Sequence, residues 1–156
     1  NRVLPAGPTV VDIMANASFY YGVLRGLVDA ERPLWSQMSF DAAAENLQAA
    51  SRDGIDAQLY WPTLGWVRPD ELVLRKLLPL ADEGLQAFGV SSDARDRYLS
   101  VIEGRALNRQ TGSVWQRASV QAREQAGDSR EEALAGMLRE YIERMHDGAP
   151  VHTWDL

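Results

Sequence analysis

Apolar residues recur every three or four positions through most of the chain, and this helical spacing limits its fold more than any other feature. The longest example follows Thr9 and Asp12, which have the spacing of a capping box, where each side chain accepts a hydrogen bond from the other residue's backbone N–H. Apolar residues then stand at positions 10, 13, 14, 17, 20, 21, 24, 27 and 28. Because this stripe is wide, we expect the helix, which must end before Arg32-Pro33, to be central to the core.

Start and stop signals divide the rest of the chain into further helices. Ser39 can cap a helix that runs to about Asp53, and Gly54 suits its end. A third helix is expected from Pro69 to about residue 88, with a kink at Pro79. The remaining helices are predicted over residues 93–108, 112–125 and 129–146, the last beginning with a second capping box.

One stretch breaks the helical spacing. "IDAQLYWP", residues 55–62, alternates as a strand does, and Trp66 and Val67 can return as a second strand after a turn. A two-stranded hairpin is not stable alone, so it must lie on the helices. The sequence therefore predicts a mainly α fold: one domain over residues 1–156, a single-layered bundle of about six helices with one short β-hairpin.

Composition excludes several classes of function. The net charge of -6 argues against nucleic acid as a partner, because phosphate binding needs a basic face. The absence of cysteine rules out disulfides and thiolate metal sites, and fits a cytoplasmic protein. The most apolar run, residues 10–28, is interrupted by Asp12, Asn16 and Arg25, so we read it as a buried helix and expect no membrane partner.

Three polar residues of the second predicted helix are the candidates for binding. Glu45 and Arg52 lie two turns apart on a similar face, and Asn46 is next to Glu45. Glu45 and Arg52 could bracket a ligand or form ion pairs across a packed interface. Asp41 and Glu45 also share a face and could hold a cation, although a solvated acidic face is the commoner meaning of such a pair.

No complete active site is visible in the residues themselves. His146 and His152 are six apart, across a Gly-Ala-Pro break and without a third ligand, so we assign no metal site. The stretch "RQTGSVWQR" could offer backbone N–H groups to an anion, but a helix start capped by Thr111 explains it better. The tryptophans at 35, 61, 66 and 115 are expected in the core or at an interface. We nominate no catalytic residue.

Three segments carry a resemblance to a known family. They are "LPAGPTVVDIMANASFYYGVLRGL", "RPLWSQMSFDAAAENLQAASRDGIDAQLYWP" and "PVHTW" at the tail. The chain resembles the C-terminal part of glutamate–cysteine ligase family 2 proteins of the actinobacterial type, carboxylate–amine ligases with a glutamine-synthetase-like fold. The strongest match is to a pattern carried here by Glu45, Asn46, Arg52, Gly54, Asp56 and Ala57. The family often has an aromatic residue and an arginine where this chain has Gln48 and Ala49.

The resemblance implies ATP-dependent ligation. The γ-carboxylate of glutamate would be phosphorylated and then attacked by the amine of cysteine or another amine, with magnesium ions neutralising the phosphates. In this fold the metal-binding carboxylates sit on a curved antiparallel sheet, which this chain lacks. The chain would thus be the helical C-terminal portion of a larger α+β ligase. Alone it would be inactive and would bind neither ATP nor magnesium.

The resemblance also implies roles for the three candidates and a partner for the chain. Arg52 would hold a substrate carboxylate, Asn46 would orient an amide or amine, and Glu45 would contribute to the same substrate site. Alternatively, the segment only docks its helix onto a sheet. The partner would be the N-terminal catalytic sheet of the same protein, and a homo-oligomer is possible. The start at Asn1 and the opening "NRVLPAGP" favour a longer chain.

A second hypothesis belongs to a different class. The chain could be a standalone helical interaction module without catalysis. Such a module would expose a large apolar patch where the ligase would place its sheet, and patches of this kind usually mark partner surfaces.

Overall fold

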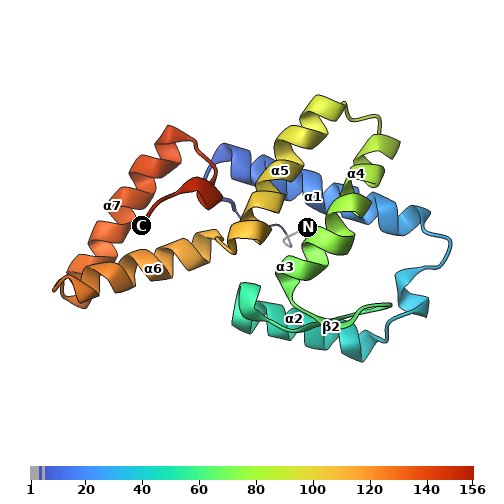
Figure 1. Cartoon of the computed structure of the whole chain (residues 1–156), viewed down its shortest axis with the longest axis horizontal. Coiled ribbons are helices and arrows are strands. Elements are labelled where there is room, and N and C mark those ends of the chain that lie inside the picture. Colours follow the sequence, from blue (N-terminus) through green and yellow to red (C-terminus); the bar gives the residue numbers. More distant parts are fainter. Residues whose placement is uncertain (1–3, 5) are drawn as a thin grey trace.

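The computed structural model describes residue 4 and residues 6–156, and it confirms a mainly helical fold with one β-hairpin (Figure 1). The helices are α1 (Val10–Asp29), α2 (Phe40–Asp53), α3 (Pro69–Leu72), α4 (Leu78–Ala87), α5 (Ser92–Asn108), α6 (Gly112–Gln125) and α7 (Arg130–Asp147). The strands are β1 (Leu59–Trp61) and β2 (Gly65–Val67). Short helical turns are η1 (Leu34–Ser36), η2 (Gly54–Asp56), η3 (Val73–Leu77) and η4 (Val151–Thr153).

The predicted helix starts are confirmed by their capping geometry. Thr9 and Asp12 form the complete capping box of α1, and Ser129 and Glu132 form that of α7. The Ser39 side chain accepts a hydrogen bond from the Ala42 N–H at the start of α2. These contacts span three residues, which is why sequence spacing alone locates them.

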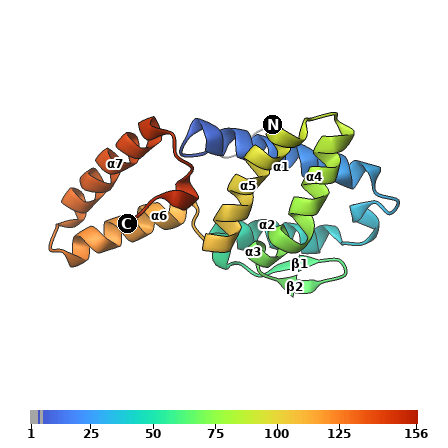
Figure 2. The same ribbon diagram turned by 45° about the horizontal axis from the view of Figure 1, so that its top comes forward.

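Helices α1, α4 and α5 form the centre of the molecule, and α4 and α5 cross α1 on the same side (Figures 1 and 2). Glycines let α1 and α4 approach closely. A Cβ added to Gly84 would lie 2.0 Å from the carbonyl oxygen of Gly22, and one added to Gly22 would lie 2.4 Å from that of Ala81. The aliphatic core between these helices includes Ala15, Ala81, Leu85, Leu99, Val101 and Ile102.

Only one face of α1 enters this core, which corrects the expectation that its wide apolar stripe is buried. Ala15 and Gly22 are buried, whereas Val10 is 77% and Val28 71% exposed. Small residues face α4, so the close approach of the two helices buries the glycine side and leaves the bulky side outside.

The predicted strand is shorter than "IDAQLYWP" suggested. Gly54–Asp56 continues from α2 as the turn η2, and β1 covers only Leu59–Trp61. Gly54 has a φ of 58°, which ends α2 in a region that side-chain-bearing residues disfavour. The antiparallel hairpin itself is confirmed, with Tyr60 opposite Trp66, and it lies against α2 (Figure 2).

The expected kink at Pro79 takes the form of a widened turn. Between α3 and α4, the Leu78 N–H bonds to the Val73 carbonyl five residues back, so η3 is a π-helical turn. A proline ring clashes with the carbonyl four residues before it, and the wider turn directly precedes Pro79. If α3, η3 and α4 are counted as one interrupted helix, the described residues contain the six helices that the sequence predicts.

The last two helices form a hairpin that extends to one side of the centre (Figures 1 and 2). Their core is aromatic: Trp115 and Trp154 are buried, and their rings meet edge to face at 5.0 Å between centroids. Val151 completes this cluster from the tail. Of the tryptophans expected in the core or at an interface, Trp115 lies in the core, whereas Trp35 and Trp66 are 83% and 63% exposed and are not core residues.

Candidate functional site

Helix α2 directs the three predicted binding residues to two different places. Asn46 is partly buried against the hairpin, whereas Glu45 and Arg52 are exposed. Glu45 and Arg52 line one open hollow of about 420 Å³ between α2, η2 and β2. The structure therefore brings two of the candidates together and places the third behind them.

The Asn46 amide forms two hydrogen bonds with the backbone of β1. Its Nδ2 donates to the Tyr60 carbonyl at 2.8 Å, and its Oδ1 accepts from the Tyr60 N–H at 2.7 Å. This side chain thus occupies the outer edge of β1 as a neighbouring strand would. In this arrangement Asn46 holds β1, which pairs with β2 and so supports Trp66 at the hollow.

Most residues that line the hollow are polar, and the exceptions are one alanine and one tryptophan. The remaining lining residues are Gln48, Ala49, Asp53, Asp56, Gln58 and Trp66. Trp66 packs edge to face on Tyr60, with 5.9 Å between ring centroids, and keeps most of its surface open. The hollow therefore combines three carboxylates, one guanidinium and an exposed indole.

Arg52 is paired with its own neighbour. Its Nε and Nη2 donate to the Asp53 carboxylate at 3.0 and 2.9 Å. The hydrogen bond to Asp53 and its negative charge raise the pKa of Arg52, and the same hydrogen bond lowers the pKa of Asp53. Both groups are exposed, so a competing carboxylate can reach the guanidinium at little cost.

The far rim of the hollow is anchored by an arginine that sequence reasoning missed. Arg109, at the end of α5, donates to Asp56 at 2.5 Å and forms an ion pair with Asp70 at 2.9 Å. The hydrogen bond to Asp70 raises the pKa of Arg109 most strongly, with a smaller contribution from Asp56. Arg109 has a φ of 52°, unusual for a residue other than glycine, and the sequence carries no local signal for it.

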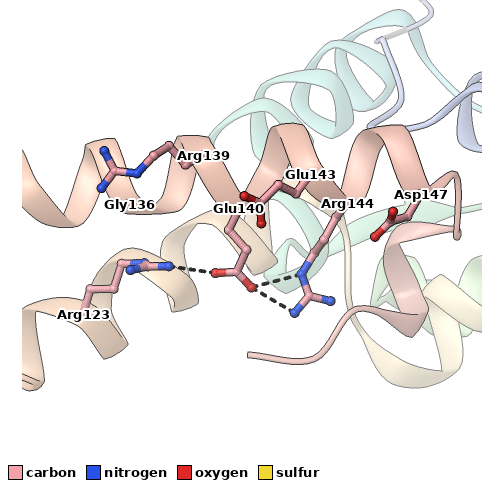
Figure 3. A pocket seen from close by; sticks show the side chains of 7 residues that line it. All are labelled: Arg123, Gly136, Arg139, Glu140, Glu143, Arg144 and Asp147. Carbon is pink, nitrogen blue, oxygen red and sulfur yellow. Dashed lines mark hydrogen bonds and ion pairs between the residues drawn. The ribbon is translucent and has the colours of Figure 1, made fainter.

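A second polar hollow of about 560 Å³ lies between α6 and α7 (Figure 3). Glu140 stands between two arginines, accepting from Arg123 at 2.9 Å and from Arg144 at 2.9 and 3.0 Å. Burial opposes ionisation, but the hydrogen bonds from Arg144 and Arg123 lower the pKa of Glu140 overall. Arg144 also lies over the Trp115 ring, 5.6 Å from its centroid. These charges satisfy one another and hold the two helices together.

A third polar cluster lies where the start of α1 meets the tail, centred on the fully buried carboxylate of Asp12. The Asp12 carboxylate accepts from Arg105 Nη2 at 2.6 Å, from Thr9 Oγ1 at 2.8 Å and from the Val151 N–H at 3.2 Å. Arg105 Nη1 also donates to Asn16 Oδ1 at 2.6 Å. The cluster joins residues 139 positions apart, and it contains parts of the opening and closing segments that carry the family resemblance.

The described residues do not assemble a magnesium site. Across residue 4 and residues 6–156, no three or more histidine, aspartate or glutamate side chains lie close enough together to hold a metal ion. His146 is exposed on α7, while His152 packs against Gly104 on α5.

Comparison with protein-family models, curated proteins and solved structures found no match for this chain. Among the helices of the described residues, none has the combined length and apolarity that crossing a membrane requires.

Proposed function

We propose that this chain is the helical C-terminal portion of a cytoplasmic, ATP-dependent carboxylate–amine ligase that forms γ-glutamyl amide bonds. Glutamate would be one substrate, and cysteine or another amine the second. The observation that carries the proposal is that Glu45 and Arg52, from the segment with the strongest family resemblance, line the same open hollow.

The chemistry of the hollow suits an amino acid. A free amino acid presents a carboxylate and an ammonium group. Arg52 has the planar donors that hold a carboxylate through two hydrogen bonds, and Glu45 can accept from an ammonium. In the structure the guanidinium of Arg52 forms an ion pair with the Asp53 carboxylate at 2.9 Å. A substrate carboxylate would take the place of Asp53 in this exposed pair.

In this proposal ATP and magnesium bind to the whole protein and not to this chain alone. When bound there, they would activate the γ-carboxylate and neutralise the phosphate charges. The carboxylates that hold the metal would come from a sheet in the same protein. The role of this chain is then to bind and orient an amino-acid substrate beside that sheet.

The test uses the full-length protein and follows ADP release that depends on both glutamate and an amine. Because Arg52 would make two charge-assisted hydrogen bonds, Arg52→Ala should raise the KM for one substrate by roughly 10–100-fold. Arg130→Ala is the matched control, since Arg130 is a similarly exposed arginine that pairs with Glu124 at 3.1 Å on the other side of the molecule.

Two results would contradict this function. One is that the full-length protein releases no ADP in the presence of glutamate, whichever amine is supplied. The other is that Arg52→Ala and Arg130→Ala behave alike. Turnover by the 156-residue chain alone would contradict the narrower proposal that it is inactive by itself.

The alternative function, a helical interaction module without catalysis, is favoured by the exposed bulky side of α1. The intact mass of the protein isolated from its native cells separates the two. A mass several times 17.4 kDa supports the ligase, and a mass near 17.4 kDa supports the module.

A further inference from the structure

An apolar seam runs along the outer side of α1. Its residues are Val10, Met14, Ala17, Tyr21, Leu24 and Val28. Apart from Ala17, each of them is between 42% and 77% exposed. No charged side chain belongs to the seam, and the nearby Arg25 is paired with Asp29 at 2.7 Å within the same helix.

The seam is separate from the face by which α1 joins the core. The inner face is marked by Ala15 and Gly22, which are buried, and by Gly26, where a Cβ would meet Leu80 at 2.5 Å. At about 100° per residue, the centres of the two faces lie on opposite sides of the helix. Helices α4 and α5 pack on the inner face, and the bulky residues of the seam stay exposed.

The spacing of the seam fits a second helix as its partner. Its residues are separated by four, three, four, three and four positions, the alternation of a heptad repeat. Over its five intervals the seam averages 3.6 residues per step, so its residues stay on one side of the helix, where a second helix can pack alongside.

The order of the residues identifies the partner helix as a second copy of α1. Reversing the helix about its midpoint places Val10 opposite Val28 and Met14 opposite Leu24. It also places the small Ala17 opposite the large Tyr21, so each bulky ring would meet a gap. In a dimer with a two-fold axis, the same surface of each copy forms the contact, so that surface must be complementary to itself. The seam meets this requirement.

The exposed surface is large enough for such a contact. Ile13, which is 45% exposed, widens the seam on one flank, where Leu24 also lines an apolar hollow of about 290 Å³. Together these side chains offer on the order of several hundred Å² per copy, close to the roughly 800 Å² that each partner buries in a stable interface. We propose that the chain forms a symmetric dimer through antiparallel pairing of α1 with α1 of a second copy.

The oligomeric state tests the proposal directly and does not depend on ligase activity. Sedimentation of the 156-residue chain across micromolar concentrations should reveal a species of twice 17.4 kDa. Leu24→Glu should weaken dimerisation at least tenfold, because it buries a charge in the seam. Leu138→Glu is the matched control, since Leu138 is a similarly exposed leucine on α7. A monomer at every concentration, or equal effects of the two variants, would overturn the proposal.

Engineered disulfides test the antiparallel orientation of the two α1 helices without introducing a charge into the seam. The chain has no cysteine of its own, so introduced thiols react only with each other. Residues 10 and 28 of one helix are about 27 Å apart and cannot form a bond within a copy. The double variant Val10→Cys, Val28→Cys should therefore yield a covalent dimer on oxidation, and each single variant should not. Dimers from a single variant would show parallel pairing and refute the proposed arrangement, as would a double variant that stays monomeric.

Discussion

Asp12 shows how one residue can serve a local and a distant purpose together. It completes the capping box of α1, which sequence spacing predicts, and it also receives Arg105 and the Val151 N–H from elements far along the chain. Its side chain is fully buried. A buried carboxylate is tolerated only when its hydrogen-bond acceptors are used, and here they are.

We expect Asp12→Ala to lower the free energy of unfolding by about 3–5 kcal/mol, because it leaves the guanidinium of Arg105 buried without its charge partner. Urea unfolding measures this loss. The control is Asp29→Ala, which breaks an exposed pair with Arg25 and should cost at most about 1 kcal/mol. Similar losses in both variants would mean that the Asp12–Arg105 pair contributes no more than a surface contact.

We expect His152 to make the free energy of unfolding depend on pH near neutrality. Burial and the positive charge of Arg105 lower its pKa, and the charge of Asp12 offsets only part of this effect. Its Nδ1 is buried and has no hydrogen-bond partner among the described residues. The folded chain therefore binds a proton at His152 less readily than the unfolded chain, whose histidine keeps its ordinary pKa of 6.5.

The sign of the effect follows from this difference. The contribution of His152 should be complete above pH 6.5 and should be lost as the pH falls below that value. Unfolding free energies measured at pH 7.5 and 5.5 should differ less in His152→Gln than in the unmodified chain. His146→Gln, at an exposed histidine, should retain the full pH dependence. An unchanged pH dependence in His152→Gln would refute the prediction.

At the scale of elements, the hairpin is stabilised by a side chain more than by its own length. Strands of three residues form few cross-strand bonds, and Asn46 supplies two further bonds to β1. This contact couples α2 to the wall of the candidate hollow. Asn46 remains predicted to touch substrate, but the structure gives its amide a positioning role.

Replacing Asn46 should loosen β1 while α2 stays helical. In Asn46→Ala the Tyr60 amide should lose its protection from hydrogen exchange, and the unfolding free energy should fall by about 1–3 kcal/mol. Asn46→Asp keeps the acceptor and should retain much of the protection. Gln48→Ala, an exposed change one half-turn further along α2, is the control. Undiminished protection of Tyr60 in the alanine variant would show that β2 alone holds the strand.

At the scale of the whole molecule, the tail joins the α6–α7 hairpin to the central helices. Gln110 Nε2 donates to the carbonyls of Val151 and Trp154 at 2.8 and 2.7 Å, and the Val151 N–H reaches Asp12 on α1. Trp154 closes the aromatic core of α6 and α7. Removing the tail should therefore weaken one part of the molecule more than the other.

We expect truncation after Gly148 to separate the unfolding of α6–α7 from that of α1, α4 and α5. Hydrogen exchange followed by mass spectrometry should show faster exchange in residues 112–147, with smaller changes in residues 10–29. Leu156→Ala, at an exposed final residue, should change neither region. Uniformly faster exchange throughout the truncated chain would indicate one cooperative unit and contradict the prediction.

The sequence alone determined where the helices begin and end. Their caps, such as Thr9 with Asp12 and Ser39 with Ala42, are hydrogen bonds across three residues, so the information lies within one turn. The sequence also predicted the β-hairpin and the wide apolar stripe along α1. It placed Glu45 and Arg52 on a similar face of α2, and the structure puts both on one hollow.

Only the tertiary structure decided which of these surfaces are covered. The burial of Asp12, the Arg109 bridge between Asp56 and Asp70, and the exposure of Val10 and Val28 all depend on elements far away in the chain. A helical period in the sequence shows that a face is apolar, but packing in the folded chain decides which element buries it. Here the glycine side of α1 packs against α4. Long-range contacts of this kind leave no local pattern in the sequence, because the residue type at one position does not indicate which distant residue it contacts.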